Sequence, residues 1–156
     1  MIYVFDTSSF IVLGHYFPNQ FPTFWKYFSE AVDAGKIVST REVAKELEHD
    51  VTREHLQQWI KANRAIFQTP TPEETLFVSK IFSVRHFQQL INERQRLKGT
   101  PVADPFVIAA AKIRHGCVVT EETFKENAAR IPNICMHFQI PCVNLENFML
   151  QQNWTF

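Results

Sequence analysis

The sequence alternates between short apolar runs and longer stretches in which apolar residues recur at helical spacing. Four short runs predict buried strands, at residues 2–5, 36–39, 117–120 and 141–143. The stretches between them predict helices at about residues 21–32, 41–48, 52–63, 72–97, 104–115, 132–138 and 145–151. Short apolar strands that alternate with helices favour a parallel sheet with helices on both faces.

Local signals support several of these boundaries. Thr71 and Glu74 stand at the spacing of a capping box, and Pro72 occupies the first helical position. Gly35 and Gly116 follow stretches of helical spacing and would end those helices. The chain contains no internal repeat and no linker long enough to divide it, so we predict a single domain over residues 1–156.

Acidic residues stand where the predicted strands end. Asp6 follows the first strand, and Glu121 and Glu122 follow the strand at residues 117–120. Glu46 lies on the helix after the second strand, and Asp104 opens the helix that leads into the third. The carboxyl ends of parallel strands meet at one edge of a sheet, so these acids are expected to converge. Such a cluster persists only if a cation neutralises it or the pKa values of its carboxylates rise, and hard ions such as Mg²⁺ or Mn²⁺ take oxygen ligands.

Each of these acids also has a purely structural interpretation. Asp6 would serve as a helix cap, and Asp104 and Pro105 would be the cap and the first helical residue of a later helix. Glu46 would be one of several solvated charges on its helix, and Glu121 or Glu122 would favour a helix dipole. No single position decides between these interpretations, so the functional prediction depends on the ordered set.

That ordered set resembles the PIN-domain family. The matching segments are VFDTSSFI, EVAKELE, ADPFVIAAAK and VVTEE, which extend in the family's order through residue 122. The resemblance implies a three-layer α/β/α fold with a central, mostly parallel sheet of four to five short strands. It also implies a metal-dependent endoribonuclease, often the toxin of a toxin–antitoxin pair.

The resemblance assigns roles to individual residues. It implies that four acids hold Mg²⁺ or Mn²⁺ for hydrolysis of an RNA phosphodiester: Asp6, Glu46, Asp104 and Glu122. The fourth acid is Glu where the family usually has Asp, and Glu121 beside it is a rival. Ser8 would orient a metal ligand, and Thr120 would bond a ligand carboxylate.

Charge and composition bear on the partners. The chain has 16 basic and 16 acidic residues, so RNA binding must come from local asymmetry. The basic stretch at residues 80–98 is one candidate, and Arg41, Lys45 and Lys112 are others, although solvated helix charges are an equal alternative. The aromatic residues between 10 and 28 predict a core helix, or else a surface for an antitoxin or a homodimer.

Other features favour a cytoplasmic location. The three cysteines form no CxxC pair, which predicts reduced thiols, and the N-terminus does not resemble a signal peptide. No run of about 18 apolar residues predicts a membrane span. The leading prediction is therefore a ribonuclease toxin. The alternatives are a catalytically weak PIN-like module that binds RNA or a partner protein, and a flap-type DNA nuclease, whose additional acids are absent.

Overall fold

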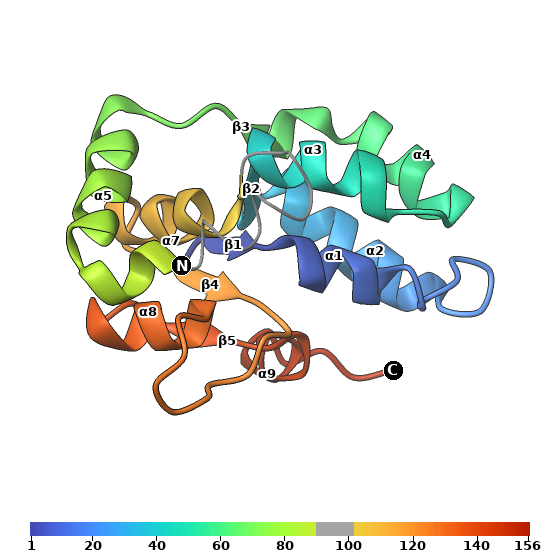
Figure 1. Ribbon diagram of the computed structural model, residues 1–156. Coiled ribbons are helices and arrows are strands. Elements are labelled where there is room, and N and C mark those ends of the chain that lie inside the picture. The colour runs from blue at the N-terminus through green and yellow to red at the C-terminus, as the bar shows by residue number, and fades with distance from the viewer. Residues whose placement is uncertain (90–101) are drawn as a thin grey trace.

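The computed structural model describes residues 1–89 and 102–156 (Figure 1). Their five strands form one sheet in the order β3-β2-β1-β4-β5, and every neighbouring pair is parallel. The strands are β1 (Tyr3–Phe5), β2 (Ile37–Thr40), β3 (Phe67–Gln68), β4 (Cys117–Val119) and β5 (Cys142–Val143). The parallel sheet predicted from the sequence is therefore confirmed, with β1 at its centre.

The helices of the described residues connect these strands. The α-helices are α1 (Thr7–Leu13), α2 (Pro22–Asp33), α3 (Arg41–Asp50), α4 (Glu54–Ala62), α5 (Pro72–Ser83), α7 (Asp104–Ile113), α8 (Ile131–His137) and α9 (Leu145–Gln151). Short 3-10 turns, η1 (Arg64–Ile66) and η2 (Arg85–Phe87), precede β3 and follow α5.

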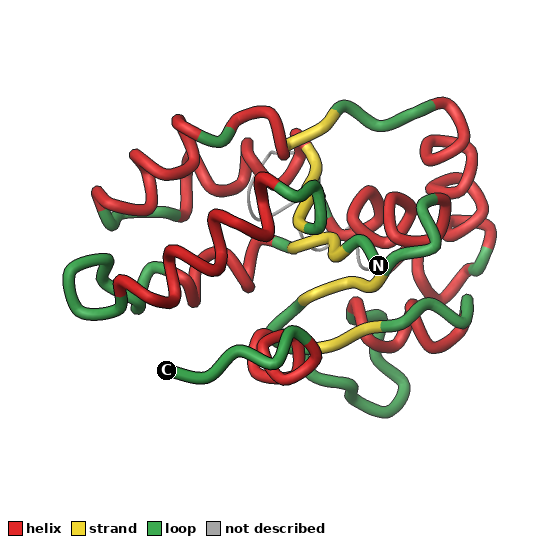
Figure 2. The backbone as a smooth tube through the Cα atoms, turned by 180° about the vertical axis from the view of Figure 1, so that it is seen from behind, coloured by secondary structure: helices red, strands yellow, loops and turns green. Residues whose placement is uncertain are grey.

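Helices cover both faces of the sheet. On one face, α7 packs against β1, β2 and β4. On the other, Phe28 of α2 and Phe148 of α9 contact Phe5, with ring centroids 5.6 and 5.2 Å apart. Both views of the backbone show the strands between a group containing α1 to α4 and a group containing α5, α7 and α8 (Figures 1 and 2). This is the predicted three-layer α/β/α architecture.

The central strand is held in register by a close approach at its start. Gly116 stands before β4, and a Cβ atom at this position would lie 2.5 Å from the carbonyl oxygen of Ile2. Only glycine allows that approach, and the next residue, Cys117, donates its N–H to the same carbonyl at 2.9 Å. The carboxyl ends of β1 and β4 consequently lie side by side.

The aromatic residues near the N-terminus serve mainly the core. Phe24, Trp25 and Phe28 of α2 are buried. Phe17 and Phe21, in the loop before α2, remain 44% and 42% exposed. The structure thus confirms the core helix and leaves a small aromatic edge on the surface.

One helix is shorter than predicted. The spacing predicted a helix over residues 72–97, but α5 ends at Ser83, and the backbone of the β-branched Val84 is extended. The side-chain amide of Gln88 donates to the carbonyl of Phe82 at 2.7 Å, which satisfies a carbonyl that a longer helix would have used. Residues 90–97 of that prediction, and residues 90–98 of the basic stretch, lie outside the described residues.

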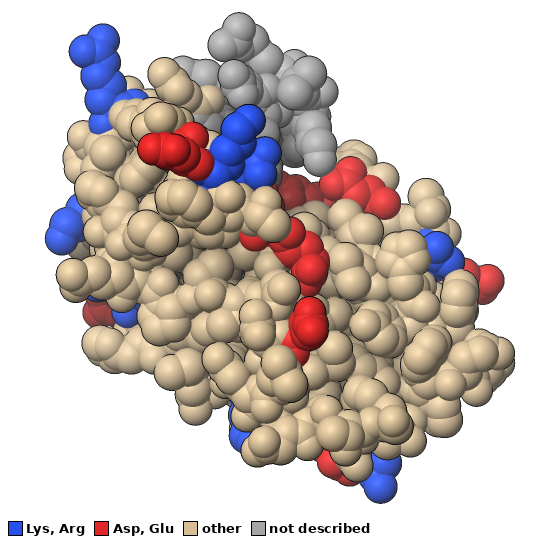
Figure 3. Space-filling view, turned by 90° about the horizontal axis from the view of Figure 1, so that it is seen from below, with Lys and Arg blue, Asp and Glu red and all other residues tan. Residues whose placement is uncertain are grey.

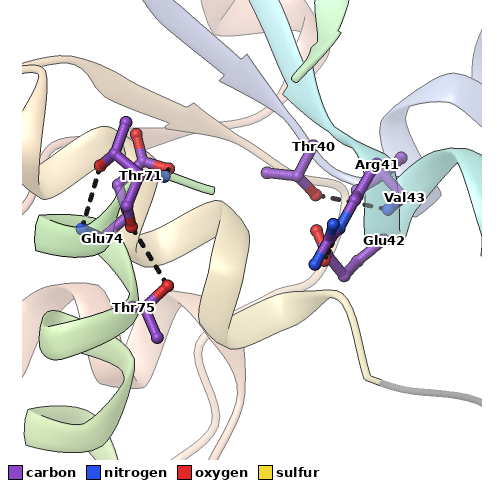
Figure 4. A network of polar contacts seen from close by, with 7 residues as sticks. All are labelled: Thr40, Arg41, Glu42, Val43, Thr71, Glu74 and Thr75. Atoms are coloured by element: carbon purple, nitrogen blue, oxygen red, sulfur yellow. Dashed lines mark hydrogen bonds and ion pairs between the residues drawn. The ribbon is translucent and has the colours of Figure 1, made fainter. Parts of the chain in front are cut away.

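The capping box at the start of α5 is confirmed. Thr71 accepts the N–H of Glu74, and the Glu74 carboxylate accepts the N–H of Thr71 (Figure 4). Within residues 1–89 and 102–156, no helix combines the length and the apolar character that crossing a membrane requires.

Candidate active site

The strand order brings together the chain segments that carry the predicted acids. Asp6 directly follows β1, and its N–H donates to the carbonyl of Val119 in β4 at 3.1 Å. Thr120 follows β4, and Thr40 ends β2 on the other side of β1. All three residues are buried. The carboxyl edge of the sheet therefore forms the floor of the candidate site.

Asp6 lies at the centre of a hydroxyl-rich network. Its carboxylate accepts hydrogen bonds from the Ser8 hydroxyl at 2.9 and 2.8 Å and from the Thr120 hydroxyl. It also accepts the N–H of Ser9 at 2.8 Å, so it caps α1. The capping interpretation of Asp6 is thus correct, but the cap uses only part of its hydrogen-bonding capacity.

Burial and hydrogen bonding have opposing effects on the pKa of Asp6. The side chain is only 3% exposed, and this burial raises the pKa above its ordinary value. The hydrogen bonds from Thr120, Ser9 and Ser8 lower it, although burial is the largest effect. A bound cation would relieve the cost of an ionised carboxylate here.

Glu46 joins two further segments. One carboxylate oxygen accepts the hydroxyl of Thr7, the residue after Asp6. The other accepts the N–H of Ala103, the residue before Asp104, at 3.0 Å. Glu46 is 7% exposed, so it is not the solvated helix charge of the structural interpretation. A single carboxylate therefore connects the chain next to Asp6 with the chain next to Asp104.

Asp104 is the first residue of α7 and is 3% exposed. The expectation that it caps this helix is wrong in detail, because Ala103 occupies the cap position and Pro105 follows within the first turn. The cap position has no side-chain hydrogen bond, and Glu46 accepts its N–H instead. The Asp104 carboxylate is thus carried by a helix start that Glu46 holds in place.

The carboxylates of Glu121 and Glu122 each accept a hydrogen bond from the start of a later helix. The Glu122 carboxylate accepts the N–H of Ile131, the first residue of α8, at 2.9 Å. The Glu121 carboxylate accepts the N–H of Leu145, the first residue of α9, at 2.7 Å. Each carboxylate satisfies a helix N-terminus that lacks an internal partner. The structure shows this shared function and leaves the choice of fourth acid a prediction.

The backbone of these two residues also supports the Asp6 network. The N–H of Glu121 donates to the Ser8 hydroxyl at 3.0 Å, and the N–H of Glu122 donates to the Thr120 hydroxyl at 3.1 Å. Each hydroxyl therefore accepts from the loop and donates its own proton to Asp6. This geometry suits the predicted role of Ser8 and Thr120 in orienting a carboxylate.

Glu42 is a buried acid that the sequence motifs did not indicate. It is 3% exposed, and one oxygen accepts from the Arg41 guanidinium Nε at 2.8 Å (Figure 4). Among the described residues, its other oxygen has no hydrogen-bond partner. Glu42 stands four residues before Glu46, a spacing that places both on one helix face, so the burial of Glu46 implies the burial of Glu42.

Burial alone does not mark a functional acid. Glu74 is only 2% exposed, yet its carboxylate completes the capping box and pairs with Arg114 at 3.2 Å. Lys112, a predicted phosphate contact, donates to the carbonyl of Phe138 at 3.1 Å. These two charges have structural partners.

The donor set agrees in kind with a hard cation. Carboxylate and hydroxyl oxygens surround the sheet edge, and Mg²⁺ prefers oxygen ligands. Within the described part of the chain, however, no three His, Cys, Asp or Glu side chains are placed to hold one ion. Mg²⁺ is commonly bound through one or two carboxylates with waters and substrate phosphates, and the site fits that form.

The charge distribution on the surface differs from place to place. One face shows acidic side chains in a row across its middle, with most Lys and Arg side chains nearer its margin (Figure 3). A neutral molecule thus still presents regions of distinct sign.

Comparison with known proteins agrees with this architecture. The fold is a PIN-like α/β/α fold, as the sequence motifs predicted. Residues 3–156 match the model of the family described as domain of unknown function DUF4411, and the chain belongs to that family.

A solved structure with the same fold is the crystal structure of VapBC2 from Rickettsia felis bound to a DNA fragment from their promoter. It is 13% identical in sequence, with a TM-score of 0.50, and the match covers 92% of this chain and 98% of that one. At this identity the likeness concerns the fold alone. No curated protein matches the sequence.

Proposed function

We propose that this protein is a metal-dependent endoribonuclease with its active site at the carboxyl edge of the sheet. The observation that carries the proposal is the double attachment of Glu46. Its carboxylate bonds the residue after Asp6 and the residue before Asp104, which ties together the segments bearing those two acids. A structural cap would need only one of these bonds. The proposal treats residues 1–156 as one PIN-like domain.

Asp6 and Asp104 would hold Mg²⁺ or Mn²⁺, with Glu46 and Glu122 as the further acids of the set. The ion would supply a Lewis acid for the phosphate and an activated water. Ser8 and Thr120 fix the rotamer of the Asp6 carboxylate through hydroxyl donors, which keeps its oxygens in a defined direction. Glu46 positions the start of α7 and so the Asp104 side chain.

The test is cleavage of a fluorescent single-stranded RNA in the presence of Mn²⁺. Asp6→Asn and Asp104→Asn preserve size and are expected to lower the cleavage rate by at least about 100-fold, since each removes a charge on which the ion depends. Glu30→Gln is the matched control, because Glu30 is an exposed carboxylate on α2. Equal cleavage rates in the wild type and the three variants would exclude a nuclease activity that depends on these acids.

A second candidate is a catalytically weak PIN-like module that binds RNA or a partner protein. The observation that favours it is the engagement of Glu121 and Glu122 with the starts of α9 and α8. Both candidates for the fourth acid then stabilise helix starts and need not bind a metal. This candidate predicts RNA binding without cleavage, and binding that Mn²⁺ does not change.

We further propose that the protein is the cytoplasmic toxin of a toxin–antitoxin pair. Support comes from the shared fold with VapBC2, itself solved bound to DNA from its promoter. The free cysteines agree with a reducing compartment. Phe17 and Phe21 offer an aromatic edge for an antitoxin or a second copy. Expression of the chain alone should arrest growth, and Asp6→Asn should abolish the arrest.

A further inference from the structure

A concave pocket lies next to the acidic site, on the opposite face of helix α3. It occupies about 440 Å³ between α3, α4 and the segment η1–β3. Its lining includes Ala44 and Leu47 from α3, Ile60 from α4 and Phe67 from β3. The volume falls within the range of small-ligand sites, which is about 300–1,000 Å³.

The rim of this pocket carries an excess of positive charge. Four cations line it, namely Arg41, Lys45, Lys61 and Arg64, against the single acid Glu48. All four are exposed, and within the described residues Lys45, Lys61 and Arg64 form no ion pair. The whole chain is neutral, so this asymmetry is a local property. It favours an anionic ligand.

The floor of the pocket is apolar. Leu47 is buried, and Ile60 and Phe67 are partly exposed, so both offer surface to a ligand. The Phe67 ring packs against Phe10 with centroids 5.3 Å apart, which fixes it in the core. An aromatic or aliphatic floor beneath a cationic rim suits a group that combines a flat apolar ring with phosphates, which is the chemistry of a nucleotide.

The start of α3 connects the pocket with the acidic site. Arg41 lines the pocket, and its guanidinium Nε also bonds the buried Glu42 at 2.8 Å. Lys45 lines the pocket, and the next residue, Glu46, lies in the candidate active site. A nucleic-acid strand that crosses the N-terminal turns of α3 would therefore reach both the pocket and the acidic site.

We infer that this pocket binds one nucleotide of a single-stranded RNA, at a position flanking the phosphodiester to be cleaved. The base lies against Phe67 and Ile60, and the adjoining phosphates lie against the four cations. This inference rests on the proposed function, because it names a subsite for that substrate. An acidic peptide would use the cations but would leave the aromatic floor without a matching group.

The experiment measures binding of a short fluorescein-labelled single-stranded RNA by fluorescence anisotropy. The Asp6→Asn chain is used throughout, so that the RNA stays intact. In this background, Lys61→Gln/Arg64→Gln is compared with Lys26→Gln/Lys36→Gln, two exposed cations outside the pocket. We expect about tenfold weaker binding for the first pair and no change for the second.

The salt dependence provides a second readout. Each phosphate contact on a single strand contributes about −0.7 to the slope of log K against log salt, so losing two contacts should make the slope less negative by about 1.4. Phe67→Leu keeps an apolar floor but removes the ring. Because base stacking on an aromatic residue is worth about 1–3 kcal/mol, binding should weaken about fivefold or more with an unchanged slope. A thermal melt of each variant checks that it is folded.

Unchanged affinity in Lys61→Gln/Arg64→Gln would overturn the inference. So would competition by polyglutamate that equals that of unlabelled RNA and is insensitive to Phe67→Leu, since the pocket would then recognise an acidic peptide. The proposed function can fail separately. If the pocket variants lose RNA binding but the wild-type chain does not cleave RNA, the nucleotide-binding pocket is supported and the nuclease activity is excluded.

Discussion

The two sides of the sheet's carboxyl edge use the same residue type for different purposes. On the β1–β2 side, Asp6 and Glu46 are buried, and each accepts a hydroxyl hydrogen bond at the sheet edge in addition to an N–H at a helix start. On the β4–β5 side, Glu121 and Glu122 are partly exposed, and their carboxylates hold the first N–H of α9 and α8.

The difference teaches how a carboxylate's partners indicate its role. The unpaired N–H groups at a helix start can donate to any nearby acid, so such a hydrogen bond alone does not indicate a catalytic role. A carboxylate buried among hydroxyls is more costly to ionise, which is why burial raises the pKa of Asp6. The site acids on the β1–β2 side are therefore expected to govern activity, and those on the β4–β5 side to govern stability first.

The largest effect that separates the two sides is expected for Glu46→Gln. The amide can accept only one of the two hydrogen bonds from Thr7 and Ala103, so the start of α7 shifts relative to Asp6. Loss of such a positioning contact commonly costs about 10–100-fold in metal affinity or activity. RNA cleavage against Mn²⁺ concentration measures both. Full activity would place Glu46 among the structural acids with Glu74.

Thr120→Val tests the hydroxyl that links the two sides. It removes the donor to Asp6 while keeping the shape of the side chain. We expect cleavage to fall by about tenfold, toward the lower end of that range for orienting residues. The pKa of Asp6 should rise further, so the acid limb of the pH–rate profile should move to higher pH. A lower rate with an unmoved profile would mean that Thr120 acts only on folding.

Glu121→Ala and Glu122→Ala form a matched pair on the β4–β5 side. Each removes a side-chain acceptor from a helix start, and loss of a cap costs about 0.5–2 kcal/mol. Urea unfolding should show a similar loss of stability for both. Only Glu122→Ala is expected to lower cleavage as well, because Glu122 is our predicted fourth acid. Greater loss of activity in Glu121→Ala would assign that position to Glu121.

The smallest effect concerns stability against pH in metal-free buffer. The folded-state pKa of Asp6 is raised, so its contribution to stability is fully present below its ordinary value of 3.8 and is lost as pH rises through the folded value. Asp6→Asn does not lose a proton. The stability of this variant relative to wild type should therefore increase as pH rises through that window and level off above the folded-state pKa of Asp6. A difference independent of pH would show that Asp6 is not penalised by burial.

Much of the architecture follows from the sequence because it depends on local pattern. Apolar runs located the strands around Asp6 and Thr120, and the capping box located the start of α5. The two-residue strand β3 escaped, since most of the short apolar run at residues 65–67 forms the turn η1 and only Phe67 of it lies in the strand. The end of α5 at Ser83 escaped because helical spacing continues beyond it.

The site was less predictable because its contacts are long-range. The motifs indicated Asp6 and Asp104, but the bond from Ala103 to Glu46 joins residues 57 positions apart. The bond from Leu145 to Glu121 spans 24 positions, and no local pattern encodes it. Burial of Glu42 was readable only by taking its spacing from Glu46 together with the orientation of α3.

The central claim is that the β1–β2 side of the edge binds the catalytic ion. The most direct measurement is an anomalous-scattering map from a crystal soaked in Mn²⁺. Our account predicts a peak within about 2.6 Å of a carboxylate oxygen of Asp6 or Asp104, the distance expected for such cations, and its loss in Asp6→Asn. A map with no peak at either residue, or with a peak only beside Glu121, would contradict it.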